Sequence, residues 1–461
     1  QFQNRVTQHS DKPFLHQPLG NGRWKIYRWQ DVDRDARIIA YGLKAQGLEK
    51  GDRVAIFAHN CAEWVLADIA IAMAGMVSVP IYSTAGASTV EYVLNHSQSK
   101  VLFTGEYTES HALDNIPDNI IAIGFKEALS GGSWQQWLDT YKPLDILPEP
   151  KLDDTYTIVY TSGSTGQPKG VVLSNRNLSA AAMDTAIFYP AEENRVLSYL
   201  PLAHITERSV VFMTALYIDS QLFFNESLAT FIGDLQHTQP TFFISVPRLW
   251  AKFQANIVTK IPNTRLQLLL KIPFLGNLVA NKIRKQMGFQ HCQLYLSGSA
   301  PISPELLRWY SKLGIDISEG WGMSETGGAA CANVPFVEAR LGSIGVPFKQ
   351  VELKTAESDE LLIRGPCVFN SYYNESEKTA ESFIDGWFKT GDRAEQTADG
   401  AWRIIGRTKD QFKTSKGKYV TPTPIENHLG ASAIIEQCCV VGEKMSQPVG
   451  LIVLADVNNL N

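Results

Sequence analysis

The sequence predicts an α/β protein with a large N-terminal domain, built from two parallel-type αβ lobes and a β-rich subdomain, and a small α+β C-terminal domain. Helical and extended patterns alternate from the N-terminus to about Gly342, which is typical of parallel sheets connected by crossover helices. Beyond Gly342, glycine and proline become frequent and the extended runs shorten, as in a β-rich subdomain. The chain has 461 residues and is 44% hydrophobic, enough for a large buried core and, by length, about three domains or lobes.

Each expected element has a local pattern behind it. Apolar residues recur at helical spacing in residues 29–46, 61–75, 177–188 and 205–215. β-Branched, aromatic and other apolar residues form extended runs at residues 51–57, 77–81, 156–160, 196–200, 241–246 and 293–297. Shorter strands are expected at residues 351–354, 361–364, 402–405, 437–441 and 449–455.

A charged turn, Gly406–Asp410, marks the predicted domain boundary. We place the large domain at residues 1–406, with its β-rich subdomain at about 342–406. The residues 411–461 form a partial small domain, since a segment of this length is thin for an independent core.

The bulk composition excludes several classes of protein. The net charge of −5 gives no sign of nucleic-acid binding. The six cysteines are scattered without a C-x-x-C pair, so neither a zinc site nor a disulfide framework is predicted, and a cytoplasmic, reducing location fits. The most apolar stretch, Ile69–Ile81, is shorter than the about 20 residues that a membrane span needs.

A loop rich in glycine and hydroxyl side chains, TSGSTGQPKG, covers residues 161–170 and directly follows an expected strand. Inward-turned backbone N–H groups and hydroxyls in such a loop can bind phosphate. It is neither a G-x-x-x-x-G-K-[ST] nor a G-x-G-x-x-G motif. The alternative is an ordinary surface loop.

A second cluster, EGWGMSETG, covers residues 319–327. Trp321 lies between glycines and could stack on a purine base. Glu325 and Ser324 offer oxygen ligands to a hard cation such as Mg²⁺. The alternative is a glycine-rich turn around a packed tryptophan.

Four further residues have a functional and a structural interpretation. Asp392, in a Thr-Gly-Asp sequence, could accept hydrogen bonds from a ribose diol, or be a simple turn residue. Arg407 could reach ribose or phosphate oxygens, or form a surface ion pair. His204 could bind a substrate carboxylate or phosphate, or it could cap the helix or pack against neighbouring residues. For Trp250, the first interpretation is an aromatic residue of the core or of an interface.

The order of these motifs resembles the acyl-adenylate-forming superfamily, which includes acyl-CoA synthetases, luciferases and adenylation domains of peptide synthetases. The resemblance extends from the region of residues 29–57 to about Ala455. Three segments, 200–208, 244–250 and 297–303, are similar to bacterial long-chain fatty acid–CoA ligases in particular.

The resemblance implies a role for each site residue. ATP phosphates are expected at Thr161, Ser162, Gly163, Ser164, Thr165, Gly166 and the loop lysine Lys169. Adenine is expected on Trp321 between Gly320 and Gly322, with Ser324 nearby, and the adenine and acyl pocket is expected to be walled by Gly298, Ser299 and Ala300. The remaining implied roles are magnesium binding by Glu325, nucleotide binding by Asp392 and Arg407, a fatty-acyl gate at Trp250, and a hinge at residues 407–410 that includes Asp410. We expect the residues that act in the chemistry to be Glu325, Lys169 and His204.

The implied reaction uses ATP, Mg²⁺ and coenzyme A (CoA). A fatty acid is activated to acyl-AMP with release of pyrophosphate, and the acyl group then passes to CoA with release of AMP. Two alternatives are a fatty acyl–AMP ligase that loads an acyl carrier protein and a nucleotide-binding relative without catalysis. The sequence does not determine the oligomeric state, and a homodimer is one option.

The sequence departs from the family pattern in three places. Ser324 stands where many members have threonine, and Lys416-Gly-Lys418 replaces a Gly-Gly-Lys sequence. The resemblance implies an adenylation lysine near the end of the small domain, and the sequence stops at Asn461 before a stretch that could supply it. We therefore expect a fragment that binds nucleotide better than it adenylates.

Residues 263–288, NTRLQLLLKIPFLGNLVANKIRKQMG, combine many apolar residues with five basic and no acidic ones. A basic, apolar helical segment can lie on an anionic bilayer. We hypothesise weak peripheral membrane binding here, on the inner face of the membrane. The alternative is a pair of core-packed helices broken at Pro273 and Gly276.

Overall fold

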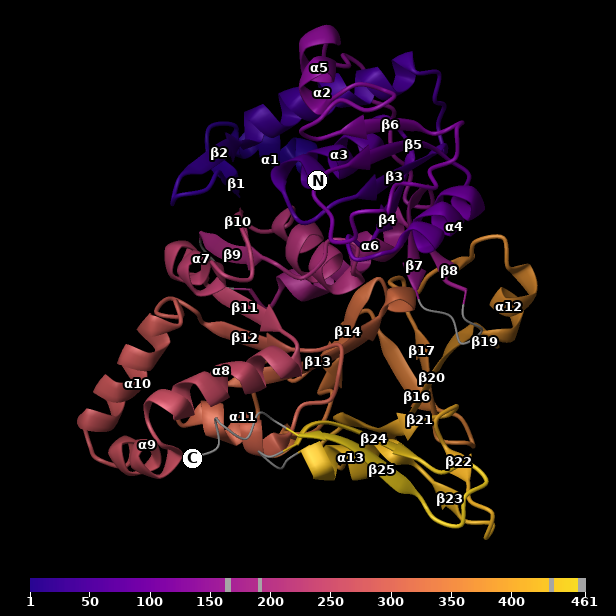
Figure 1. The fold of residues 1–461 in the computed structure, drawn as a ribbon. Helices are drawn as coiled ribbons and strands as arrows, with labels where there is room; N and C mark the ends of the chain where they lie inside the picture. The colour runs from indigo at the N-terminus through magenta and orange to yellow at the C-terminus, as the bar shows by residue number, and fades with distance from the viewer. Residues whose placement is uncertain (162–166, 190–192, 431–434, 455–461) are drawn as a thin grey trace. The chain divides into compact units, whose positions relative to one another are not determined.

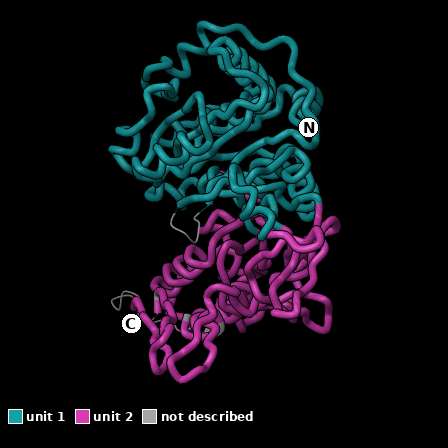
Figure 2. The backbone as a smooth tube through the Cα atoms, turned by 90° about the vertical axis from the view of Figure 1, so that its right-hand side faces the viewer, with its two compact units in different colours: residues 1–234, 323–329, 366–381 teal, residues 235–322, 330–365, 382–461 magenta. Residues whose placement is uncertain are grey.

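The computed structural model describes residues 1–161, 167–189, 193–430 and 435–454. The chain forms two compact units, each assembled from three separate segments (Figure 2). Unit 1 contains residues 1–234, 323–329 and 366–381, and unit 2 contains residues 235–322, 330–365 and 382–461. The boundary predicted at residue 406 does not coincide with a boundary between these units, so the small-domain assignment stays a prediction.

The predicted α/β class is confirmed by several sheets with helices between their strands (Figure 1). The main sheet of unit 1 has seven strands in the order β18-β8-β7-β4-β3-β5-β6. Neighbours from β4 to β6 are parallel, whereas β8 pairs antiparallel with β7 and β18. Its strands are β3 (Arg53–Phe57), β4 (Val77–Ile81), β5 (Ser99–Thr104), β6 (Ile121–Gly124), β7 (Thr155–Thr161), β8 (Lys169–Ser174) and β18 (Ser371–Tyr372).

Crossover helices connect these parallel strands, as the alternating sequence pattern predicts. They include α3 (Ala62–Met73) between β3 and β4 and α4 (Ala87–Ser97) between β4 and β5, and α2 (Trp29–Ala45) precedes β3. Apolar residues of β3, β4, β5 and β7 pack with α4 in one buried core. Other helices of unit 1 include α1 (Phe2–His9), α5 (Trp134–Thr140), α6 (Asn175–Ala186), the 3-10 helix η2 (Ser324–Thr326) and α12 (Ser376–Glu381).

A second sheet of unit 1 has the order β2-β1-β10-β9. Its strands are β1 (Pro13–Pro18), β2 (Trp24–Arg28), β9 (Asn194–Ser198) and β10 (Ser220–Phe224). The helix expected at residues 205–215 is a π-helix, η1 (Thr206–Met213). Arg208 of η1 is fully buried, forms an ion pair with Asp68 and donates to Thr157 at 2.8 Å. This buried pair ties η1 to α3 and the main sheet.

The first sheet of unit 2 has the order β11-β12-β13-β14-β15, and its first three strands are parallel. The strands are β11 (Phe242–Ser245), β12 (Leu294–Ser297), β13 (Ile317–Met323), β14 (Gly328–Ala332) and β15 (Val346–Pro347). The helices are α7 (Phe231–Thr238), in which the chain enters unit 2, α8 (Pro247–Lys260), α9 (Asn263–Leu270), α10 (Leu275–Gln286), α11 (Pro304–Ser311) and the 3-10 helix η3 (Glu338–Arg340).

The predicted β-rich segment forms an antiparallel sheet of β16, β17, β20, β19 and β21. Its strands are β16 (Glu352–Thr355), β17 (Glu360–Arg364), β19 (Phe383–Ile384), β20 (Trp387–Gln396) and β21 (Trp402–Arg407). Further along lie β22 (Phe412–Lys413), β23 (Tyr419–Val420), α13 (Pro422–Gly430), β24 (Ile435–Val441) and β25 (Val449–Leu454). Among the residues described, no helix has the length and apolar character that crossing a membrane requires.

Candidate functional site

The β7–β8 hairpin holds the described ends of the glycine-hydroxyl loop together. Thr161 and Lys169 are register partners in this antiparallel pair. The candidate phosphate ligands between them, Ser162, Gly163, Ser164, Thr165 and Gly166, lie outside the described residues. The Thr161 hydroxyl is buried and has no hydrogen-bond partner among the described residues. A cationic lysine beside an unsatisfied hydroxyl fits an oxygen-rich anion such as phosphate.

Lys169 and Glu325 meet in unit 1, although they are far apart in the sequence. Lys169 Nζ lies 3.1 Å from Glu325 Oε1. Both side chains contact the hydroxyl of Tyr372, which accepts from Lys169 Nζ at 2.7 Å and donates to Glu325 Oε1 at 2.8 Å. Glu325 is almost fully buried, and its backbone carbonyl accepts from the N–H of Phe369 at 2.7 Å. A carboxylate, a cation and a phenol therefore form one closed triangle.

The turn after Glu325 requires a glycine. Gly327 has φ of +63°, and an added Cβ would lie 3.2 Å from the carbonyl oxygen of Cys367. The Ser-Glu-Thr-Gly sequence thus holds Glu325 against neighbouring backbone. Magnesium commonly uses one or two carboxylates together with substrate phosphates. Glu325 beside the loop fits that donor set; the described residues contain no cluster of three or more His, Cys, Asp or Glu side chains that could hold a metal ion.

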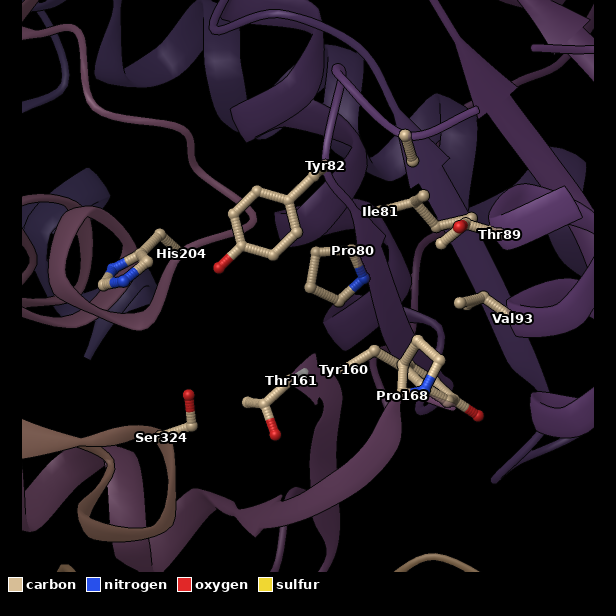
Figure 3. Close-up of a pocket in the computed structure, with 11 residues that line it drawn as sticks. Pro80, Ile81, Tyr82, Thr89, Val93, Tyr160, Thr161, Pro168, His204 and Ser324 are labelled. Atoms are coloured by element: carbon tan, nitrogen blue, oxygen red, sulfur yellow. The ribbon is translucent and has the colours of Figure 1, made fainter. Parts of the chain in front are cut away.

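Unit 1 also contains a pocket of about 380 Å³ (Figure 3). It is lined by Pro80, Ile81, Tyr82, Ala85, Thr89, Val93, Tyr160, Thr161, Pro168, His204 and Ser324. The lining is apolar except for neutral hydrogen-bonding groups. Two of its polar members adjoin the charged pair: Thr161 is the register partner of Lys169, and Ser324 precedes Glu325 in the sequence. The pocket therefore suits an apolar molecule with a polar end.

His204 faces this pocket as a neutral hydrogen-bond donor. Burial lowers the pKa of its imidazole below the usual value. Nδ1 accepts the backbone N–H of Thr206 at 3.1 Å, so the neutral ring has its proton on Nε2. Tyr82 lies edge-on to the ring at 6.3 Å between centroids, and burial raises the pKa of its phenol to about 12. The sequence predicted a site role for His204 but not for Tyr82 or Tyr372, because tyrosines outside a motif have no distinguishing local pattern.

Unit 2 brings together the residues predicted to bind the nucleoside. Trp321 Nε1 donates to Asp392 Oδ2 at 2.9 Å, and Arg407 Nε lies 3.2 Å from Asp392 Oδ1. Asp392 and Arg407 are register partners on β20 and β21. The turn interpretation of Asp392 is wrong, because the residue is buried within a strand that also pairs with β17. The half-buried Trp321 also packs against Leu361, Ala394 and Trp402.

The glycines around Trp321 lie where strand ends approach closely. A Cβ on Gly298 would lie 3.3 Å from the carbonyl oxygen of Gly320. Ser299 has a positive φ of 66°, and both Ser299 and Ala300 are exposed. Gly320 and Gly322 flank Trp321 on β13. The proposed wall residues and the proposed stacking residue thus adjoin within unit 2.

Trp250 and Asp410 have different surroundings. Trp250 is fully buried, donates to the Leu296 carbonyl at 3.3 Å and packs edge-on to Phe243 and Tyr310. This placement matches the core interpretation and does not join Trp250 to the described pocket lining, so its gate role stays a prediction. Asp410 lies in an exposed turn after β21, and its hinge role also stays a prediction.

Two family descriptions match the chain. The family described as AMP-binding enzyme matches residues 2–373, and its C-terminal domain matches residues 409–460. A long-chain-fatty-acid–CoA ligase of Mycobacterium bovis is 32% identical over 470 residues, covering 93% of this chain and 77% of that protein. A fatty acyl-CoA synthetase of Dictyostelium discoideum is 31% identical over 507 residues, covering 97% and 75% of the two chains.

Solved structures show the same fold. An anthranilate CoA ligase in complex with anthranoyl-AMP matches with a TM-score of 0.81 and 21% identity, over 98% of this chain and 86% of the other. The o-succinylbenzoate CoA synthetase of Bacillus subtilis with its acyl-adenylate matches with a TM-score of 0.79 and 22% identity, over 100% and 90%. From the extent of the family match and the identity to its curated members, the chain belongs to the AMP-binding enzyme family.

Proposed function

We propose that this protein is a fatty acid–CoA ligase for long-chain substrates, which forms acyl-AMP from ATP and transfers the acyl group to CoA. Family membership and the names of the relatives support this proposal. The observation on which it rests is in unit 1: an apolar pocket with neutral donors adjoins the Lys169–Glu325 pair. This combination suits a substrate with an apolar chain and a carboxylate that must meet a phosphate.

The chemistry follows from the poor leaving ability of a carboxylate oxygen. The fatty acid carboxylate attacks the α-phosphorus of ATP, the bond to the bridging oxygen breaks, and pyrophosphate leaves. The CoA thiol then attacks the acyl carbon of the mixed anhydride and loses its proton, and AMP leaves. Magnesium, when bound, offsets negative charge on the phosphates.

Residues of unit 1 act on the phosphates and the carboxyl group in this proposal. Lys169 and the loop after Thr161 bind the β- and γ-phosphates, and Glu325 is the magnesium ligand. The Nε2–H of His204 donates to an oxygen of the reacting carboxyl group. Because the buried imidazole is neutral, it orients that oxygen without neutralising the nucleophile.

Residues of unit 2 bind the adenosine part of ATP in this proposal. Trp321 stacks on adenine beside Gly320 and Gly322, with the segment from Gly298 to Ala300 as a wall. Asp392 accepts hydrogen bonds from the ribose hydroxyls, and Arg407 adds donors to ribose or phosphate oxygens. The Trp321–Asp392 hydrogen bond supports this assignment, because it orients the indole and the carboxylate together.

One assay separates this proposal from its alternatives. The purified protein is incubated with ATP, Mg²⁺, palmitate and either CoA or an acyl carrier protein. Palmitoyl-CoA with equal amounts of AMP and pyrophosphate supports the ligase. Acyl-AMP and acyl carrier protein product without acyl-CoA favour the carrier-loading alternative, whereas ATP binding without any product favours a non-catalytic relative.

We also propose a cytoplasmic protein that binds weakly to anionic membranes through α9 and α10. Leu266, Ala280 and Ile283 are buried in unit 2, so the core interpretation holds for one face of the two helices. Other large apolar side chains of the same segment are exposed: Leu268 at 65%, Ile272 at 43%, Phe274 at 86%, Leu275 at 39% and Leu278 at 65%.

The charges around this apolar surface complement an anionic bilayer. Arg265, Lys271, Lys282 and Lys285 are exposed, and residues 263–288 contain no acidic side chain. Arg284 differs, because its guanidinium donates to the carbonyl of Gly314 at 3.2 Å and so belongs to the fold. Exposed apolar residues among exposed lysines are typical of a surface that inserts shallowly into lipid headgroups.

A further inference from the structure

Tyr372 is in contact with both charged groups to which the proposed function assigns phosphate and metal binding. Its phenolic oxygen lies 2.7 Å from Lys169 Nζ and 2.8 Å from Glu325 Oε1. The ammonium also lies 4.0 Å from the centre of the Tyr372 ring. Tyr372 is 4% exposed, so water does not compete freely for these contacts.

The backbone of Tyr372 is held from two sides. It pairs with Val171 through the β8–β18 register, which fixes it relative to Lys169 at the start of β8. Its N–H donates to Thr379 Oγ1 at 3.0 Å, which ties it to α12. The main chain that carries the phenol is therefore held by contacts that do not involve the two charged side chains.

We propose that Tyr372 is a positioning residue that orients the carboxylate of Glu325 for its cation, an inference that rests on the proposed magnesium role of Glu325. Lys169 and Tyr372 both contact Oε1 of Glu325, so Oε2 is the oxygen that would ligate a cation. When Lys169 moves to the phosphates, Glu325 loses one of its two partners. The phenol remains as a donor and keeps the carboxylate in place.

This positioning role predicts that loss of the Tyr372 hydroxyl weakens binding of the metal ion and not binding of the metal-free nucleotide. The Tyr372→Phe variant keeps the ring, its packing and its contact with the lysine ammonium, and removes only the hydroxyl. Mn²⁺ is titrated into protein saturated with α,β-methylene-ATP, and free Mn²⁺ is followed by its electron paramagnetic resonance signal. We expect about tenfold weaker Mn²⁺ binding, as for one lost hydrogen bond to a charged group. Binding of the nucleotide in EDTA should stay within about twofold of the parent.

The neighbouring Tyr373 supplies a matched control. Its ring lies 5.8 Å from that of His96, and its hydroxyl has no hydrogen bond to a described residue. Tyr373→Phe should therefore leave both measurements unchanged. An equal loss of Mn²⁺ and metal-free nucleotide binding in Tyr372→Phe would indicate general disruption and overturn the positioning role, as would unchanged Mn²⁺ binding.

A double-mutant cycle separates this inference from the proposed function. If Tyr372 acts through Glu325, adding Tyr372→Phe to Glu325→Gln should weaken Mn²⁺ binding no further, and an additive loss would contradict the inference. Parent-like Mn²⁺ binding by Glu325→Gln alone overturns the magnesium role in the proposed function. A loss in Glu325→Gln with parent-like Tyr372→Phe overturns only the positioning role.

Discussion

The indole N–H of Trp321 donates a 2.9 Å hydrogen bond to Oδ2 of Asp392. In the sequence these residues are separate candidates, one for adenine and one for ribose. In unit 2 they are one hydrogen-bonded pair, and Arg407 engages the other carboxylate oxygen at 3.2 Å. Removal of the Asp392 carboxylate should therefore affect more than its own ligand contacts.

Asp392→Ala should weaken ATP binding by about 2–4 kcal/mol. The variant loses the proposed charged acceptor for the ribose hydroxyls, each bond being worth roughly 1.5–3 kcal/mol, and releases the Trp321 indole. Isothermal titration calorimetry with ATP measures the change. Glu395→Ala, which removes an exposed, arginine-paired carboxylate from the same strand, is the control and should bind normally. Unchanged affinity in Asp392→Ala would show that the residue has only a structural role.

Glu325→Gln should abolish acyl-adenylate formation while the fold persists. The amide keeps the side-chain volume and a hydrogen-bonding oxygen for Tyr372, but it loses the charge that we propose binds magnesium. Pyrophosphate release with palmitate and ATP is the measurement, with circular dichroism as the check on folding. Glu377→Gln, on the exposed surface of α12, should be fully active. Near-normal pyrophosphate release in Glu325→Gln would refute the assignment.

His204→Gln should retain more activity than His204→Leu. A glutamine amide can replace the Nε2–H donor, whereas leucine fills the space without a donor. Since burial lowers the pKa of His204, the activity of the parent should also show no step near pH 6.5, which is about the usual pKa of histidine. The pH profile of kcat/KM for palmitate tests both points. Equal activities of the two variants would contradict a donor role.

Glu207→Gln should flatten the dependence of stability on pH. Burial raises the pKa of the Glu207 carboxyl from 4.5 to about 8. Between these values the folded state binds more protons than the unfolded state, so the stabilising contribution, full below 4.5, is lost as pH rises to 8. The difference in the free energy of unfolding between parent and variant should change by at most about 1.4 kcal/mol per pH unit.

Urea unfolding of the two proteins at several pH values measures this difference. Glu377→Gln again serves as the control, because its carboxylate is exposed, and it should follow the parent. Parallel stability curves for the parent and Glu207→Gln would show that Glu207 is ionised in the folded state.

Membrane binding should depend on both the charge and the apolar surface of the α9–α10 segment. Replacing Lys271, Lys282 and Lys285 with glutamine should reduce co-sedimentation with phosphatidylcholine–phosphatidylglycerol vesicles at low salt, each lysine contributing about 1 kcal/mol. Phe274→Ser should reduce it separately, because that side chain is 86% exposed and supplies apolar area. Arg284 is left unchanged because it bonds to Gly314.

A charge-matched variant controls for net charge. Lys44, Lys142 and Lys349 are exposed elsewhere on the chain, and their replacement with glutamine should leave binding near the parent level. Equal losses in both triple variants would indicate nonspecific electrostatics. A parent protein that never sediments with the vesicles would refute membrane binding altogether.

The sequence by itself determined the fold class and most of the elements. Alternation of apolar helices and β-branched runs predicted β4 (Val77–Ile81) at its observed bounds and α2 within one residue. These are local properties, since the spacing of apolar residues and the effect of turn residues involve only residues close together in the sequence. The order of the motifs also predicted the family, because each motif retains its recognisable residue types.

The tertiary structure decided which of these residues contact one another. Lys169, Glu325 and Tyr372 meet only because β18 and η2 return to the start of β8, and no local pattern reports such pairing. The same holds for Asp392, whose position in a buried strand depends on partners β17 and β21. In α9, apolar residues surround more than one face, so packing alone separates buried Leu266 from exposed Leu268. Burial depends on contacts with residues that are distant in the sequence, whereas a sequence pattern reflects only residues that are close together in the sequence.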